Sequence, residues 1–171
     1  NSLKPTWVDR DRFILSKGHA APSLYAILAE SGYFPIGELL SLRKIGSRLQ
    51  GHSDYRVPGI EVSAGSLGQG LSIASGIAYD GKLDKKDFRV YVLLGDGECN
   101  EGQVWEAAMF SSHYKLDNLI MIIDRDYLQI DGMTEKVMSL EPFALKWNSF
   151  GWHVIEINGN EIREIINALD D

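Results

Sequence analysis

The chain has 171 residues and a formal net charge of −7, with 44% hydrophobic and 24% charged residues. This length and composition suit one globular domain with one core, and the acidity makes nucleic acid and anionic membrane surfaces poor partners, because both are polyanions. The single cysteine, Cys99, excludes an internal disulfide and is typical of a reducing compartment, so we expect a cytoplasmic location.

Apolar patterns predict strands that alternate with helices along the chain. The predicted strands are two short ones at residues 13–15 and 60–62 and three longer, buried ones at 89–94, 118–124 and 152–157. The predicted helices are residues 20–30, 34–42, 67–79, 102–114 and 161–169. This alternation predicts an α/β fold, a parallel sheet with helices on both faces. Ligands of such sheets bind beyond the carboxyl ends of the strands, so the residues that follow each strand are the candidate site.

The strand predicted at residues 89–94 leads directly into Gly95-Asp96-Gly97, and a helix follows. The two glycines allow a sharp turn and the close approach of a bulky anion. The helix that follows offers free N–H groups and a positive dipole end to a phosphate, and Asp96 can bind a hard cation through oxygen. The alternative without a ligand is a strand-to-helix turn in which Asp96 is a local cap.

The next predicted strand, residues 118–124, leads into a second acidic segment, Asp124-Arg125-Asp126-Tyr127-Leu128. Its carboxyl end should lie on the same edge of the sheet as Asp96. Period-two alternation along this strand predicts that Arg125 points away from Asp96.

Three segments together resemble the transketolase family more closely than other thiamin diphosphate enzymes. They are Gly95-Asp96-Gly97, Trp105-Glu106-Ala107-Ala108 and Leu128-Gln129-Ile130-Asp131-Gly132. The resemblance implies the thiamin-diphosphate-binding fold and a divalent metal, Mg²⁺ or else Ca²⁺ or Mn²⁺, bound by Asp96, Asp126 and the Leu128 carbonyl. It also implies that Gly95, Gly97 and Glu98 contact the cofactor. The family has asparagine where this chain has Asp126; we expect Asp126 still to bind the cation while its charge opposes the diphosphate.

Three upstream motifs match the same family. They are Ser16-Lys17-Gly18-His19-Ala20, Gly51-His52-Ser53-Asp54 and Gly65-Ser66-Leu67-Gly68-Gln69-Gly70. The resemblance implies that His19 contacts the diphosphate, that His52 faces the reacting carbons of the sugar, and that Gly65, Ser66 and Leu67 hold the cofactor ring. The alternatives for these motifs are a helix cap, a surface loop and close helix packing.

The resemblance implies a catalytic role for Glu101 as well as for His19 and His52. In the family, the glutamate at this position orients the catalytic apparatus by hydrogen-bonding to a second carboxylate on the partner domain. The alternative is an acidic residue in the first turn of a helix, where the helix dipole favours it.

The implied function is transfer of a two-carbon ketol unit from a ketose phosphate to an aldose phosphate, the transketolase reaction of the pentose phosphate pathway. Residues 1–171 would form a single domain on the diphosphate side of the site, truncated at both ends relative to the family. A carboxyl-terminal half, as a domain or as a subunit of a split enzyme, would complete a homodimer or heterotetramer. Two alternatives stay open: another thiamin diphosphate enzyme, such as deoxyxylulose-phosphate synthase or a 2-oxoacid dehydrogenase component, and a degenerate, non-catalytic binding subunit.

Overall fold

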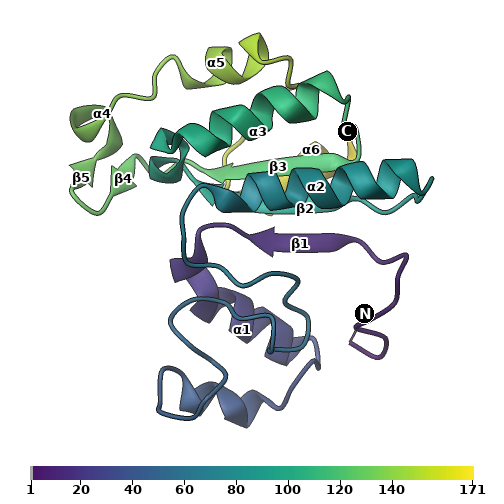
Figure 1. The fold of residues 1–171 in the computed structure, drawn as a ribbon. Coiled ribbons are helices and arrows are strands. Elements are labelled where there is room, and N and C mark those ends of the chain that lie inside the picture. The colour runs from purple at the N-terminus through teal and green to yellow at the C-terminus, as the bar shows by residue number, and fades with distance from the viewer. Residues whose placement is uncertain (1) are drawn as a thin grey trace.

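The computed structural model, which describes residues 2–171, has a parallel three-stranded sheet at its centre (Figure 1). The strands are β1 (Arg12–Leu15), β2 (Val90–Gly95) and β3 (Leu119–Asp124), in the order β1-β2-β3. Both neighbours pair with β2 in parallel, with Leu15 beside Leu93 and with the last residue of β2 beside the last residue of β3. The carboxyl ends of all three strands therefore meet at one edge of the sheet.

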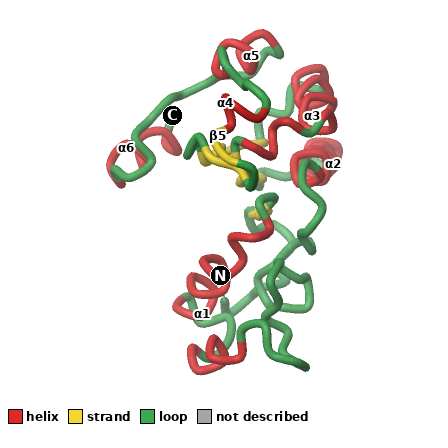
Figure 2. Tube along the Cα trace, turned by 90° about the vertical axis from the view of Figure 1, so that its left-hand side faces the viewer, coloured by secondary structure: helices red, strands yellow, loops and turns green. Residues whose placement is uncertain are grey.

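Helices lie on both faces of the sheet. The helices α2 (Gln69–Leu83) and α3 (Gly102–His113) pack against each other on one face, and α6 (Ile162–Asp170) lies on the opposite side (Figure 2). Small residues allow α2 and α3 to approach closely, and the hydroxyl oxygens of Ser75 and Ser111 lie 2.8 Å apart between them. The predicted α/β fold with helices on both faces is confirmed.

A second cluster of buried apolar residues lies below β1 in the orientation of Figure 1, around α1 (Ala21–Glu30). The 3-10 helix η1 (Gly18–Ala20) leads from β1 into α1, and the 3-10 helix η2 (Ile36–Ser41) follows α1. Tyr25 is 1% exposed and its hydroxyl donates to the His52 carbonyl at 2.9 Å. The cluster thus fixes the loop that carries His52 relative to α1.

Several short elements of the carboxyl-terminal third have no counterpart among the predicted ones. The antiparallel hairpin of β4 (Leu128–Gln129) and β5 (Gly132–Met133) leads into α4 (Thr134–Val137), and α5 (Phe143–Ser149) follows. These elements are too short to produce a clear apolar period. Among the described residues, no helix is long and apolar enough to cross a membrane.

Two of the five predicted strands are wrong. Residues 60–62 and 152–157 form no ladder with any described strand. The second segment does alternate, since Trp152 and Val154 pack on the core while His153 and Ile155 are exposed. Alternation reports which side faces the core, whereas a ladder also needs a neighbouring strand within hydrogen-bonding distance. Residues 34–42, predicted as helical, contain only the 3-10 helix η2.

Two glycines of α2 provide a test of the packing between this helix and Ser16, the residue that follows β1. An added Cβ at Gly70 would lie 2.2 Å from the Ser16 hydroxyl oxygen and 2.4 Å from its Cβ, whereas one at Gly76 would meet nothing within 4 Å. We expect Gly70→Ala to lower the free energy of unfolding by about 1–3 kcal/mol through overpacking. Gly76→Ala should raise it by about 0.5–1 kcal/mol through helix propensity. Urea denaturation followed by circular dichroism measures both, and equal shifts would contradict the packing.

Candidate functional site

The carboxyl edge of the sheet gathers the residues that follow its three strands. The backbone N–H of Asp96 donates to the Asp124 carbonyl at 3.1 Å, and that of Lys17 donates to the Leu93 carbonyl at 3.2 Å. After β2 the chain turns through the 3-10 helix η3 (Gly97–Asn100) into α3. The predicted residues Gly95, Asp96 and Gly97 therefore lie at the strand end, as expected for a ligand site of a parallel sheet.

Asp96 is 1% exposed, and its carboxylate accepts hydrogen bonds from three donors. Oδ1 accepts from the Gly97 N–H at 2.7 Å, and Oδ2 accepts from the Tyr127 N–H and from Arg125 Nη1, both at 2.9 Å. The expectation that Arg125 points away from Asp96 is wrong. β3 ends at Asp124, so the alternation of the strand does not extend to residue 125.

Asp126 and Leu128 lie on a tight turn beside Asp96. The Asp126 side chain is exposed and its Oδ1 accepts from the Leu128 N–H at 2.9 Å. Tyr127, between them, has a φ of 63°, a left-handed conformation that residues other than glycine rarely adopt. The hairpin packs closely on η3, since an added Cβ at Gly97 would lie 2.8 Å from the Gln129 Cβ.

The donor set of this turn fits a hard divalent cation. Asp96 and Asp126 offer carboxylate oxygens and Leu128 a backbone carbonyl, which are the oxygen ligands that Mg²⁺ and Ca²⁺ prefer. Within residues 2–171, no three histidine, cysteine or acidic side chains already converge as a metal cluster. A metal held by this set would depend on backbone and ligand oxygens in addition to its two carboxylates.

Glu98, predicted to contact the cofactor, accepts hydrogen bonds from three separate segments of the chain. It is 3% exposed, and its Oε1 accepts from the Ser16 hydroxyl and from the Gly68 N–H, the latter at 2.8 Å. Its Oε2 accepts from the Gly95 N–H at 3.1 Å.

Burial, and then the charges of Glu98 and Asp96, raise the pKa of the Cys99 thiol, so this side chain is no nucleophile at neutral pH.

The three upstream motifs meet around Gly18. An added Cβ there would lie 2.8 Å from the Ala64 Cβ, 3.1 Å from the His52 ring and 3.3 Å from the Gly65 nitrogen. The side chains of His19 and His52 are exposed. Only glycine at position 18 allows the segment of His19, the loop of His52 and the glycine-rich loop to come this close.

The glycine-rich loop also contacts the segment of Glu101. Gly68, with a φ of 82°, caps the start of α2, and an added Cβ there would lie 2.7 Å from the Glu101 Cβ. Gly65, Ser66, Leu67 and Glu101 are all exposed. Every predicted site residue thus lies at or near the carboxyl edge of the sheet, and the ligand contacts of these residues stay predictions.

The sequence patterns assigned no role to Lys17, which is the basic residue of the first motif. Its side chain is 11% exposed, and its Nζ donates to Asp124 Oδ2 at 2.7 Å across the end of β2. Lys17 and Arg125 together place two positive charges at this edge of an acidic protein. The signal in the sequence was the position of Lys17, two residues after the predicted strand 13–15 and two residues before His19.

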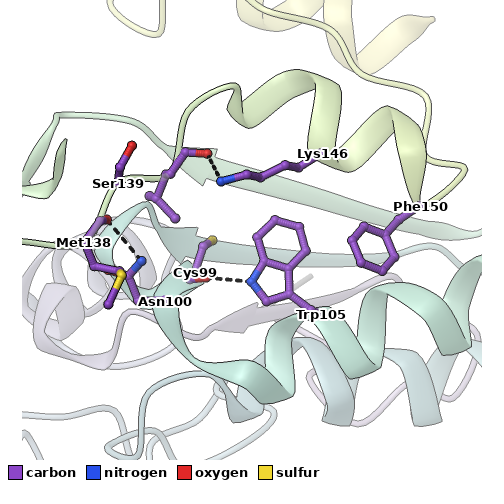
Figure 3. A pocket seen from close by; sticks show the side chains of 8 residues that line it. Cys99, Asn100, Trp105, Met138, Ser139, Lys146 and Phe150 are labelled. Atoms are coloured by element: carbon purple, nitrogen blue, oxygen red, sulfur yellow. Dashed lines mark hydrogen bonds between the residues drawn. The ribbon is translucent and has the colours of Figure 1, made fainter.

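Two cavities lie near this region, and the larger one contains no predicted site residue. It measures about 300 Å³ and lies between η3, α3 and α5, where the Trp105 indole donates to the Cys99 carbonyl at 2.9 Å (Figure 3). The other measures about 230 Å³ and is lined by Ser16, Gly65, Ser66 and Gly70, among others. We regard the smaller one as part of the candidate site, because it combines the glycine-rich loop with the end of β1.

A family model and two curated relatives indicate the same family for this chain. The family model described as "Transketolase, thiamine diphosphate binding domain" matches residues 1–171. The chain is 51% identical to an apulose-4-phosphate transketolase subunit of Phocaeicola vulgatus over 97% of this chain and 59% of that protein. It is 49% identical to human transketolase over 98% of this chain and 27% of that protein.

A solved structure gives the same result for the fold. The transketolase of Campylobacter jejuni is 35% identical, with a TM-score of 0.93, over 99% of this chain and 28% of that one. The chain thus spans about 59% of the length of the Phocaeicola relative and 27% of the human protein.

Proposed function

Because this chain belongs to the transketolase family, whose matching part is the thiamin-diphosphate-binding domain, we propose that it supplies the metal and diphosphate half of a transketolase active site. The observation that carries the proposal is Asp96, a buried carboxylate between two glycines at a strand end, with the turn of Asp126 and Leu128 beside it. The reaction is transfer of a two-carbon ketol unit from a ketose phosphate to an aldose phosphate.

The cofactor, when bound, supplies the carbon nucleophile that receives the two-carbon unit, and the protein binds and orients it. Asp96, Asp126 and the Leu128 carbonyl would hold Mg²⁺, and the ion would supply positive charge that favours binding of the diphosphate. Gly97 begins η3, with its N–H donated to Asp96, and would place its backbone close to the diphosphate. His19 would donate to phosphate oxygens from the other side. Lys17, whose ammonium group pairs with Asp124 at the same edge, offsets part of the negative charge there.

The glycine-rich loop and the two remaining candidates would act on the reactive end of the cofactor. The Gly65 carbonyl would accept a hydrogen bond from the exocyclic amine of the cofactor, and the Leu67 side chain would support the cofactor ring. Ser66, between them, would also contact the ring. His52 would face the sugar. Glu101, exposed beside Gly68, would pair with a carboxylate of the partner domain. The exposure of Glu101 supports a site that is completed by another part of the enzyme.

The partner we propose is a carboxyl-terminal transketolase half. The relatives from Phocaeicola vulgatus and Clostridium sp. are both named as transketolase subunits, and this chain covers 59% and 61% of them. We therefore propose a split enzyme, assembled as a heterotetramer, with a homodimer of long chains as the alternative. The Clostridium relative is named for 6-deoxy-6-sulfo-D-fructose and the other for apulose 4-phosphate, so we propose phosphorylated or similarly anionic sugars as substrates.

The test is ketol transfer by the assembled enzyme. We expect product from a ketose phosphate and an aldose phosphate only when thiamin diphosphate and Mg²⁺ are both present, and calorimetry should record cofactor binding that depends on Mg²⁺. Transfer from a 2-oxoacid donor instead would indicate a different thiamin diphosphate enzyme. Binding without any transfer would indicate a non-catalytic subunit.

Asp126, where the family has asparagine, provides a further prediction. Asp126→Asn keeps the acceptor oxygen for the Leu128 N–H and removes one negative charge beside the diphosphate. We expect the variant to bind thiamin diphosphate more tightly, on the order of 1 kcal/mol for one charge at ~4 Å, and to bind the metal alone more weakly. Titration of both ligands measures this, with Asp131→Asn on the exposed hairpin turn as the charge-matched control. Weaker cofactor binding by Asp126→Asn would contradict the charge argument.

A further inference from the structure

Arg125 joins the predicted metal ligand Asp96 to three other side chains. Its Nη1 donates to Asp96 Oδ2 at 2.9 Å and to Thr134 Oγ1 at 3.0 Å. Its Nη2 donates to Glu135 Oε1 at 2.9 Å and to Glu141 Oε1 at 2.7 Å. The Arg125 side chain is only 17% exposed, so this guanidinium group is held within the fold, with both terminal nitrogens in use.

Two aromatic rings fix the plane of the same guanidinium group. Its central carbon lies 4.1 Å from the centroid of the Tyr127 ring and 5.4 Å from that of Phe143. A planar cation close to aromatic rings gains cation–π attraction and loses rotational freedom. Arg125 therefore has one well-defined position.

The segment that follows Arg125 carries two of the predicted metal ligands, Asp126 and the Leu128 carbonyl. The Tyr127 N–H donates to Asp96, and the Tyr127 carbonyl accepts from the N–H of Thr134, which is fully buried, at 2.9 Å. Residues 126–133 thus form a loop that is closed at both ends, and Arg125 bonds to Asp96 at one end and to residues 134–141 at the other. The position of Asp126 and of the Leu128 carbonyl relative to Asp96 depends on this closure.

The charge of Arg125 acts in two opposite directions on a bound metal. A cation beside Asp96 repels a second cation, which would weaken metal binding. However, the guanidinium group is shared among Asp96, Glu135 and Glu141, so negative charge remains in excess around it. Without Arg125, these three carboxylates would repel one another and the loop would open.

We propose that Arg125 is a positioning residue for the metal site, which holds Asp96 and the loop of Asp126 and Leu128 in the arrangement that binds the cation. This inference rests on the proposed function. Side chains that orient metal ligands typically change metal affinity 10–100-fold when they are replaced. The positioning effect exceeds the repulsion, so loss of Arg125 weakens metal binding.

The test measures Mn²⁺ affinity of the assembled enzyme in the presence of thiamin diphosphate, by electron paramagnetic resonance of free Mn²⁺. Arg125→Gln should bind Mn²⁺ at least about 10-fold more weakly than wild type. Arg125→Lys should restore little, because one ammonium group cannot replace two parallel donor nitrogens. The matched control is Arg48→Gln, which breaks a similar pair with Glu38, at 2.6 and 2.9 Å, beside the Phe34 ring. It should lower the stability while leaving the Mn²⁺ affinity at the wild-type value.

Each other outcome overturns one specific statement. Unchanged or tighter Mn²⁺ binding by Arg125→Gln overturns the positioning role, and so does an equal loss in Arg48→Gln. If Arg125→Gln does not fold, Thr134→Val removes one acceptor of the guanidinium group and should weaken Mn²⁺ binding by a smaller factor; no change there also overturns the inference. A wild-type enzyme that binds neither Mn²⁺ nor cofactor contradicts the proposed function instead.

Discussion

Asp96→Ala is expected to abolish Mg²⁺-dependent binding of thiamin diphosphate by the assembled enzyme. Asp96 is the buried carboxylate of the proposed metal set, and alanine offers no oxygen to the ion. The substitution also leaves three donors without their acceptor: the N–H groups of Gly97 and Tyr127 and the side chain of Arg125. Isothermal calorimetry with and without Mg²⁺ measures the loss.

The matched control is Asp117→Ala, two residues before the start of β3. This carboxylate pairs with Lys82 at 2.8 Å and is largely exposed, so its loss should leave cofactor binding unchanged. Because unpaired buried donors destabilise a fold, circular dichroism must first establish that the Asp96 variant is folded. If alanine is not tolerated, Asp96→Asn keeps one acceptor oxygen but removes the charge, and it should weaken Mg²⁺-dependent cofactor binding rather than abolish it. A folded variant that still binds the cofactor with wild-type affinity would refute the assignment.

Residues 1–171 alone are expected to give no measurable ketol transfer, although the assembled enzyme should be active. Gly65, Leu67, His52 and Glu101 are all exposed in this chain, so the reactive end of the cofactor would lie in water. The partner half would cover the site and exclude water from it. It would also supply the carboxylate that forms a hydrogen bond with Glu101. A coupled assay of sugar phosphate products, before and after addition of the remaining parts of the enzyme, measures the difference.

A contaminating host transketolase is the main alternative source of activity in that assay. Preparing the Asp96→Ala form of the chain in parallel controls for it, because contaminating activity would be the same in both preparations. Turnover by the wild-type chain that the substitution removes would mean that this chain carries a complete site. The proposed division of the site between two halves would then be wrong.

Local patterns in the sequence were sufficient to predict the elements that place the site. The apolar run before Gly95 predicted β2, and the helical spacing after Gly102 predicted α3, because a buried strand and a helix packed on a sheet each impose a period on nearby residues. The parallel sheet followed from their alternation. The motifs of His19, His52 and Asp96 are likewise local, so their resemblance to one family is visible in the sequence alone.

Contacts between segments far apart in the chain were decided only by the tertiary structure. Glu98 accepts from Ser16 and Gly68, Lys17 pairs with Asp124, and Arg125 turns inward onto Asp96. Residues 152–157 alternate like a strand but pair with none of the described strands. Sequence periodicity reports which side of an element is buried, whereas the partner of a charge or of a strand depends on which other segment the fold brings within bonding distance.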